Sequence, residues 1–180
     1  LTVLTTIIGA LSVAAGLALS GTLQNFTSGV LILLLKPFRV GDIIIAQGQE
    51  GIVSSIQIFF TVVTTYQNTT VVIPNSKLSN EVIINLSRQG KRRLDVELKF
   101  SFGISFDEVR SVVQKRIDAS PEILKEPGAH FGVSAVDADG YKVMINIWVD
   151  ALAYNKTKLQ FQEEIIDDLK NAGLKLPGIN

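Results

Sequence analysis

Two groups of acidic residues have the types and spacing that could bind a metal ion or carry out acid–base chemistry. They are Asp137 with Asp139, and the group of Glu163, Glu164, Asp167 and Asp168. The first pair flanks a predicted turn at Asp139-Gly140, and the second group lies on the polar face of a predicted helix. Both positions are typical of solvated or ion-paired carboxylates. We therefore expect neither catalysis nor metal binding at either group.

The rest of the sequence excludes most other catalytic chemistry. The 180 residues contain no cysteine and one histidine, His130, which removes thiol catalysis, thiolate metal sites and a multi-histidine site within one chain. The glycine-rich nucleotide motifs, the zinc protease motif and the serine hydrolase motif are also missing. The formal net charge is zero, so no general attraction to nucleic acid is expected. We predict a protein that is not an enzyme and has no cofactor, metal or nucleic-acid partner.

Residues 1–36 form the first of three predicted regions and are expected to cross a membrane. No charged residue occurs from Leu1 to Leu35, a length that exceeds the roughly 20 apolar residues needed to span a bilayer. Lys36 and Arg39 follow at once, and by the positive-inside tendency the residues after Lys36 are expected to be cytoplasmic. A buried helix of a soluble protein is the alternative.

The predicted membrane helix is expected to be interrupted near Ser20-Gly21. Glycine costs a helix roughly 1 kcal/mol, and kinks often occur at Gly/Ser pairs. The following residues, 22–35, are amphipathic and are expected to lie along the membrane interface. Gly21 is therefore predicted to be a hinge, with Gly29 as a second bend and Pro37 as the end of the helix.

Two further regions follow the helix. Residues 37–90 contain short β-branched runs separated by turn residues, which indicates a small closed or half-closed β domain. Its expected strands are residues 42–46, 51–56, 59–66, 70–74 and 82–87. Residues 91–180 are predicted to form an α+β cytoplasmic domain, a ferredoxin-like sandwich. Its expected elements, in the order strand, helix, strand, strand and helix, are residues 94–102, 105–120, 130–138, 141–150 and about 155–171.

Small residues of the first helix form two rows when they are placed on a helical wheel. At about 100° per residue, Val13 and Leu17 form one narrow apolar stripe. The flanks of this stripe are Ala10, Ala14 and Ala18 on one side, and Ser12, Gly16 and Ser20 on the other. Small residues let membrane helices approach closely, so two such rows suit a helix with a neighbour on each side, as in a closed ring.

In such a ring, Val13 and Leu17 would face the axis and form a dry constriction that blocks ions by excluding water. The alternative is that the small residues reflect ordinary helix crossing inside one protomer. The helix would then be a simple anchor for a cytoplasmic binding or scaffold module, although a simple anchor does not need two small-residue rows.

Three stretches resemble the small-conductance mechanosensitive channel (MscS-type) family. They are residues 16–42, GLALSGTLQNFTSGVLILLLKPFRVGD, residues 51–59, GIVSSIQIF, and residues 71–88, VVIPNSKLSNEVIINLSR. The resemblance starts at the family's pore-lining transmembrane helix and covers nearly the whole chain. It implies a homoheptamer in the bacterial inner membrane, in contact with membrane lipids. Channels of this family open under membrane tension and release ions and small solutes in hypo-osmotic shock.

The resemblance also implies roles for individual residues of the helix. The family's two hydrophobic pore rings fall on Val13 and Leu17, the stripe found on the helical wheel. The first ring is often leucine, and valine is smaller, so a looser seal or a wider pore is expected. The kink glycine of the family falls on Gly21, and the glycine linked to bending and inactivation falls on Gly29.

A contact between the pore helix and the β domain is implied for Asn25. Its expected partner is the turn at Pro74-Asn75, and the next residue, Ser76, stands where glycine is common in the family. The chain begins with Leu instead of Met, lacks the family's outer helices and ends at Asn180, before the family's C-terminal strand. We therefore expect that sequence is missing at both ends.

Overall fold

The computed structural model describes residues 2–176 and separates the chain into two compact units, Leu1–Arg88 and Gln89–Asn180. The first unit contains the long helix α1 (Thr2–Leu35), a β-sheet and the short helix α2 (Asn75–Asn80). The strands of its sheet are β1 (Ile43–Ala46), β2 (Gln49–Ile56), β3 (Phe60–Thr65), β4 (Thr70–Pro74) and β5 (Ile84–Asn85). Helix α1 and the β domain, predicted from sequence as separate regions, thus lie in one unit.

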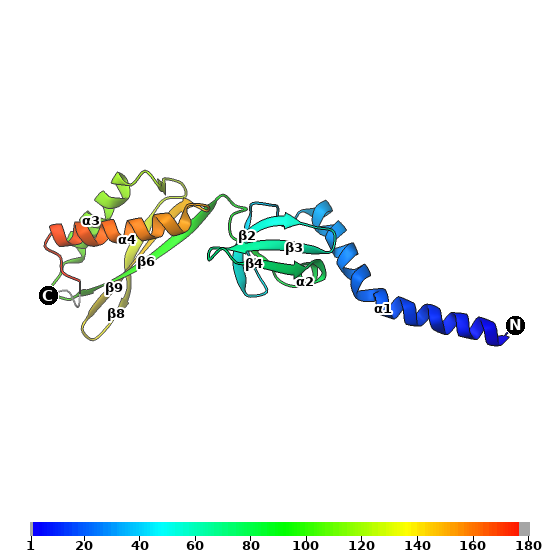
Figure 1. Ribbon diagram of the computed structural model, residues 1–180. Helices are drawn as coiled ribbons and strands as arrows, with labels where there is room; N and C mark the ends of the chain where they lie inside the picture. The colour runs from blue at the N-terminus through cyan, green and yellow to red at the C-terminus, as the bar shows by residue number, and fades with distance from the viewer. Residues whose placement is uncertain (1, 177–180) are drawn as a thin grey trace. The chain divides into compact units, whose positions relative to one another are not determined.

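Helix α1 is continuous over its 34 residues, so the predicted interruption at Ser20-Gly21 is wrong. The helix bends along its course instead of breaking (Figure 1). The cost of one glycine is too small to end a long apolar helix. Ser20 Oγ donates to the Leu17 carbonyl at 2.8 Å, a type of side-chain bond that leaves a helix intact and often bends it.

The sheet of the first unit has the strand order β4-β3-β2-β1-β5, with antiparallel neighbours. This order is an open path within the described residues, so the sheet does not close on itself there. Its core is formed by Phe38, Ile44, Val53 and Val63, with Ile32 of α1 and Leu78 of α2 packed against them.

Two elements of the first unit differ from the predictions made from sequence. Helix α2 occupies residues 75–80, where a turn was expected after Pro74. Strand β5 pairs over only two residues of the predicted strand 82–87. The reason is that Asn85 and Ser87 use their side chains to bind backbone groups: Asn85 Oδ1 accepts from the Arg88 N–H and Ser87 Oγ accepts from the Ile43 N–H.

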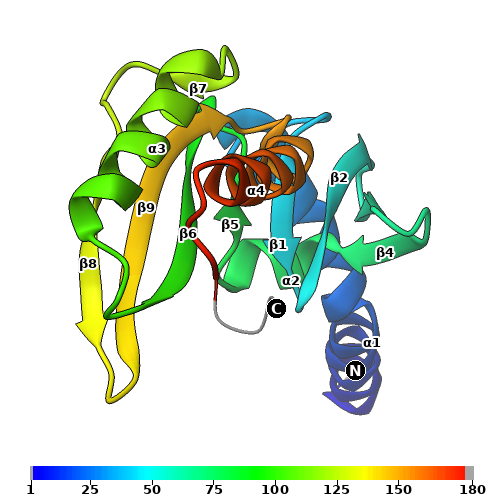
Figure 2. The same cartoon turned by 90° about the vertical axis from the view of Figure 1, so that its left-hand side faces the viewer.

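The second unit is a sheet with helices packed on it, and the predicted order of strands and helices is found. Its elements are β6 (Lys91–Ser101), α3 (Phe106–Ala119), β7 (Ile123–Leu124), β8 (His130–Val136), β9 (Gly140–Asp150) and α4 (Tyr154–Asn171). Strand β9 pairs with β6, β7 and β8, all antiparallel. Helices α3 and α4 lie side by side over the sheet (Figure 2). The short strand β7 was not predicted, and Pro177, expected to follow the last helix, lies outside the described residues.

A single hydrophobic core joins these layers. Alternate residues of β9 are buried, including Val143, Ile145 and Ile147. They pack with Val113 of α3 and Ile165 of α4, each fully buried. The period of two along β9 and the amphipathic pattern of the two helices therefore account for the fold of this unit.

An ion-pair cluster connects α3 to α4. The guanidinium of Arg116 donates to Asp168 Oδ2 at 2.6 Å and to Glu164 Oε2 at 2.9 Å. The hydrogen bond to Asp168 raises the pKa of Arg116, burial lowers it, and the charges of both acids add to the rise. The three side chains are only 21–32% exposed, so this cluster is better shielded than a surface ion pair.

Replacing Arg116 with alanine is expected to lower the free energy of unfolding of the second unit by about 1–2 kcal/mol, between the values for exposed and buried pairs. The change leaves two partly buried carboxylates close together without a cation. Chemical denaturation followed by the fluorescence of Trp148, the one tryptophan of the chain, measures the effect. Arg110→Ala is the control, because Arg110 lies on the same helix but is 58% exposed. Equal losses in the two variants would contradict the prediction.

Candidate pore helix and its contact with the β domain

The first half of α1 presents its side chains outward. Within the described residues, α1 is the one helix that is long and apolar enough to cross a membrane. The two residues predicted to form the constriction, Val13 and Leu17, are 64% and 72% exposed. They lie one helical turn apart, as the helical wheel requires, and no other residue between 2 and 176 covers them.

The small-residue flanks of this stripe are also uncovered. A Cβ atom placed on Gly16 or Gly21 would meet no heavy atom within 4 Å outside its own helix. Ser12 Oγ donates to the Ile8 carbonyl at 2.8 Å, and Ser20 Oγ binds a carbonyl of the same helix in a similar way. Both hydroxyl groups thus have a partner without a second helix, so these flanks can face lipid or another helix at little polar cost. Among the helices and strands that the structure describes, none other than α1 contacts the flanking residues.

The second half of α1 packs against the β domain along one face. Ser28, Gly29 and Ile32 are buried there, and the rings of Phe26 and Phe59 lie 6.2 Å apart. Residues 22–35 were predicted to lie along the membrane interface; one face of this segment lies on the β domain, and its position in a membrane stays a prediction. The opposite face keeps exposed leucines, such as Leu34 at 73% exposure.

Asn25 connects this helix to the β domain through its side chain. Its Oδ1 atom accepts a hydrogen bond from the Ser76 N–H at 2.9 Å. Its Nδ2 atom donates to the Gly21 carbonyl at 3.1 Å. The structure thus brings together three of the predicted residues, Gly21, Asn25 and Ser76. Because Ser76 uses its backbone N–H, a serine in place of glycine leaves the bond intact.

Asn75 is fully buried next to this contact but bonds to different groups. Its Nδ2 atom donates to the carbonyls of Gln57 and Ile58, at 2.8 and 3.1 Å. Its Oδ1 atom accepts from Thr61 Oγ1 at 2.9 Å. Asn75 therefore fixes the loop between β2 and β3 by pairing two of its backbone carbonyls.

Gly29 lies directly against that loop. A Cβ atom at this position would be 2.1 Å from the Ile58 carbonyl oxygen and 2.6 Å from Asn75 Nδ2. Gly29 was predicted as a bend, but here it is a residue of continuous helix that permits close packing. Sequence reasoning did not identify Ile58 or Thr61 as part of this contact, because the backbone carbonyl of Ile58 has no sequence signal. For Thr61, the one available signal was a polar residue next to the apolar residues of β3.

Four of the six carboxylates considered as candidate sites have a basic partner: Asp137, Asp139, Glu164 and Asp168. Lys99 Nζ lies 3.1 Å from Asp137 Oδ2 and 2.7 Å from Asp139 Oδ1. The hydrogen bond to Lys99 lowers the pKa of Asp139. Glu164 and Asp168 bind Arg116, as described above. Among the described residues there is no cluster of three or more potential metal ligands.

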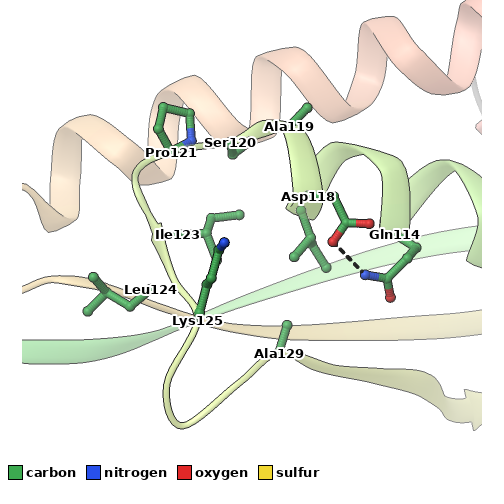
Figure 3. A pocket seen from close by; sticks show the side chains of 10 residues that line it. Gln114, Asp118, Ala119, Ser120, Pro121, Ile123, Leu124, Lys125 and Ala129 are labelled. Carbon is green, nitrogen blue, oxygen red and sulfur yellow. Dashed lines mark hydrogen bonds between the residues drawn. The ribbon is translucent and has the colours of Figure 1, made fainter.

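A hollow of about 730 Å³ lies beside α3, and it does not have the features of an active site. Figure 3 shows its lining, in which Gln114 Nε2 donates to Asp118 Oδ1 at 2.9 Å. The ionisable residues there, Asp118 and Lys125, are both exposed to solvent. Exposed groups of this kind lack the desolvation that tunes catalytic acids and bases.

The chain is similar in sequence and fold to known mechanosensitive channels. Residues 21–88, which contain the second half of α1 and the β domain, match the family described as "Mechanosensitive ion channel, beta-domain". The chain is 35% identical over 174 residues to an uncharacterized MscS family protein of Synechocystis, covering 97% of the chain and 59% of that relative. The chain is thus similar over nearly all of its length to the MscS family of mechanosensitive channels, a family of channels and not of enzymes.

Two further relatives agree with this assignment. A small-conductance mechanosensitive channel of Edwardsiella ictaluri is 32% identical over 170 residues, covering 93% of the chain and 59% of the relative. The crystal structure of Helicobacter pylori MscS in its closed state matches with a TM-score of 0.89 at 24% identity, covering 99% of this chain and 71% of that one. The predicted fold class is thereby confirmed. The chain spans about three fifths of the length of the curated relatives.

Proposed function

We propose that this chain forms the pore and the cytoplasmic part of a mechanosensitive channel that opens under membrane tension. It would release ions and small solutes in hypo-osmotic shock. The observation that supports this proposal best is the division of α1. Its first half is apolar and uncovered, whereas its second half is packed on an MscS-type β domain. Such an uncovered apolar surface requires lipid or other protein as a neighbour.

The proposed assembly is a homo-oligomer, and we favour a heptamer in the bacterial inner membrane with the residues after Lys36 in the cytoplasm. Two small-residue rows on opposite flanks of α1 support a ring, because each helix then has equivalent contacts on both sides. Membrane lipids would cover the outward face. Two relatives are named small-conductance mechanosensitive channels, which supports a channel.

The proposed gate is the pair of rings made by Val13 and Leu17. In the closed state these rings exclude water, and ions cannot pass without their hydration. Tension favours the state of larger area in the membrane plane, so the first halves of α1 would tilt apart. Gly21 would be the joint, because the contact of Asn25 with Ser76 holds the second half on the β domain.

The test is current recording from patches that contain the full-length protein. We expect currents that appear at a reproducible suction. We also expect the protein mass of the assembly in detergent to be about seven times the mass of one subunit. Currents without a suction dependence would contradict tension gating. A monomer without current would instead support a membrane-anchored binding module.

A further inference from the structure

The C-terminal end of α1 is bound by a residue far away in sequence. Arg88 Nη1 donates to the carbonyl oxygens of Lys36 and Pro37, both at 2.7 Å. Lys36 ends the helix with a positive φ of 50°, and its N–H still donates to the Ile32 carbonyl at 2.8 Å. The carbonyls at the end of a helix lack partners within it and form the negative end of its dipole. A guanidinium supplies both the donors and the charge that this position favours.

Arg88 is itself positioned by bonds to the β domain. Its N–H donates to Asn85 Oδ1 at 2.9 Å, and Asn85 Nδ2 donates to Asp42 Oδ2 at 2.7 Å. The neighbouring Ser87 accepts from the Ile43 N–H at 2.8 Å. Asp42 and Ile43 lie at the start of β1. The backbone that presents Arg88 is thus fixed to the start of β1, at one end of the β1–β5 pairing.

The other arginines near this position have different roles. Arg93 binds Asp95 at 2.8 and 3.0 Å, and the guanidinium of Arg92 lies 3.8 Å from the centre of the Tyr154 ring. These contacts are within the second unit. Arg88 is the last residue of the first unit. It is therefore placed where the β domain leads into the second unit, and it binds the end of the helix.

We propose that Arg88 is a positioning residue for gating. Its two hydrogen bonds connect the end of α1 to the strand β5 and make the second half of α1 move together with the β domain. Asn25 and Gly29 fix the N-terminal part of that half, so bending would be confined to the first half of α1. The gating role rests on the proposed function, whereas the connection itself does not.

Hydrogen exchange on the full-length protein in detergent tests the connection. In Arg88→Gln, we expect the amide of Lys36 and its helical neighbours to exchange about tenfold faster, the factor that corresponds to about 1.4 kcal/mol. Arg88→Lys keeps the charge but not the planar fork of donors, so it should also exchange faster than the unmodified protein. Lys91→Gln, which removes a nearby exposed cation, is the control and should change nothing. Unchanged exchange in both Arg88 variants would overturn the proposal.

Patch recordings test the gating role separately. We expect the current of Arg88→Gln to decay several-fold faster under sustained tension, because the second half of α1 can leave its position without the β domain. Lys91→Gln should decay like the unmodified protein. Faster exchange with unchanged decay would overturn the gating role. If the unmodified protein gave no current, the proposed function would fail, and the exchange result would still decide whether Arg88 holds the helix end.

Discussion

Replacing Leu17 with serine is expected to lower the tension at which the channel opens and to produce openings without applied suction. In the proposed closed state, the ring of Leu17 side chains excludes water, and serine hydroxyl groups would bind it. Removing a leucine side chain from apolar contact costs roughly 1.5–3 kcal/mol, so the closed state would lose stability of that order for each subunit. Since about 1.4 kcal/mol is a tenfold change in an equilibrium, even one such loss is large. The measurement is the tension at half-maximal current in excised patches.

Leu11→Ser is the matched control for this experiment. Leu11 lies on the opposite face of the same helix and is 65% exposed in one chain, close to the 72% of Leu17. The two substitutions therefore make the same chemical change on one helix, about 9 Å apart along its axis. If Leu11→Ser lowered the opening tension as much as Leu17→Ser did, the polar change would act on the helix in general. The assignment of Leu17 to a constriction would then be wrong.

The sequence allowed α1 and the order of the other main elements to be predicted because each has a strong one-dimensional pattern. The first 35 residues lack charge, and β-branched apolar residues recur at every second position of β9 from Val143 to Val149. Helix α2 lacked such a pattern. Its six residues, NSKLSN, include just one apolar side chain, Leu78, and one buried leucine cannot show a helical period. The strand assigned to residues 82–87 failed for a related reason, since Asn85 and Ser87 bind backbone groups that a strand would pair.

The contacts of the candidate site depend on groups that are distant in sequence. The contact of Asn25 with Ser76 was implied by family resemblance alone, and the residues are 51 positions apart. Arg88 and Lys36 are 52 positions apart, and the group that Arg88 binds is a backbone carbonyl, which every residue has. The basic run at residues 88–93 gave no sign that its first member differs from the rest. Such contacts need the fold before they can be found.

Gly29→Ala is expected to weaken the packing of α1 on the β domain, although alanine is the better helix former. The gain in helix propensity is about 1 kcal/mol. The added Cβ atom would lie 2.1 Å from the Ile58 oxygen and 2.9 Å from the Ile58 carbonyl carbon, so backbone must shift. Overpacking of this kind costs typically about 1–3 kcal/mol, and we expect it to exceed the gain.

The measurements for Gly29→Ala are the melting temperature in detergent and the hydrogen exchange of the Ser76 amide, which donates to Asn25. We expect a lower melting temperature and faster exchange. Gly9→Ala makes the same chemical change where a Cβ atom meets nothing within 4 Å, so it should be neutral or slightly stabilising. If Gly29→Ala behaved like Gly9→Ala, the loop at Ile58 would be able to retreat without cost. Gly29 would then not be required for the close approach of the helix, and Asn25 and Arg88 would have to hold the second half of α1 in place.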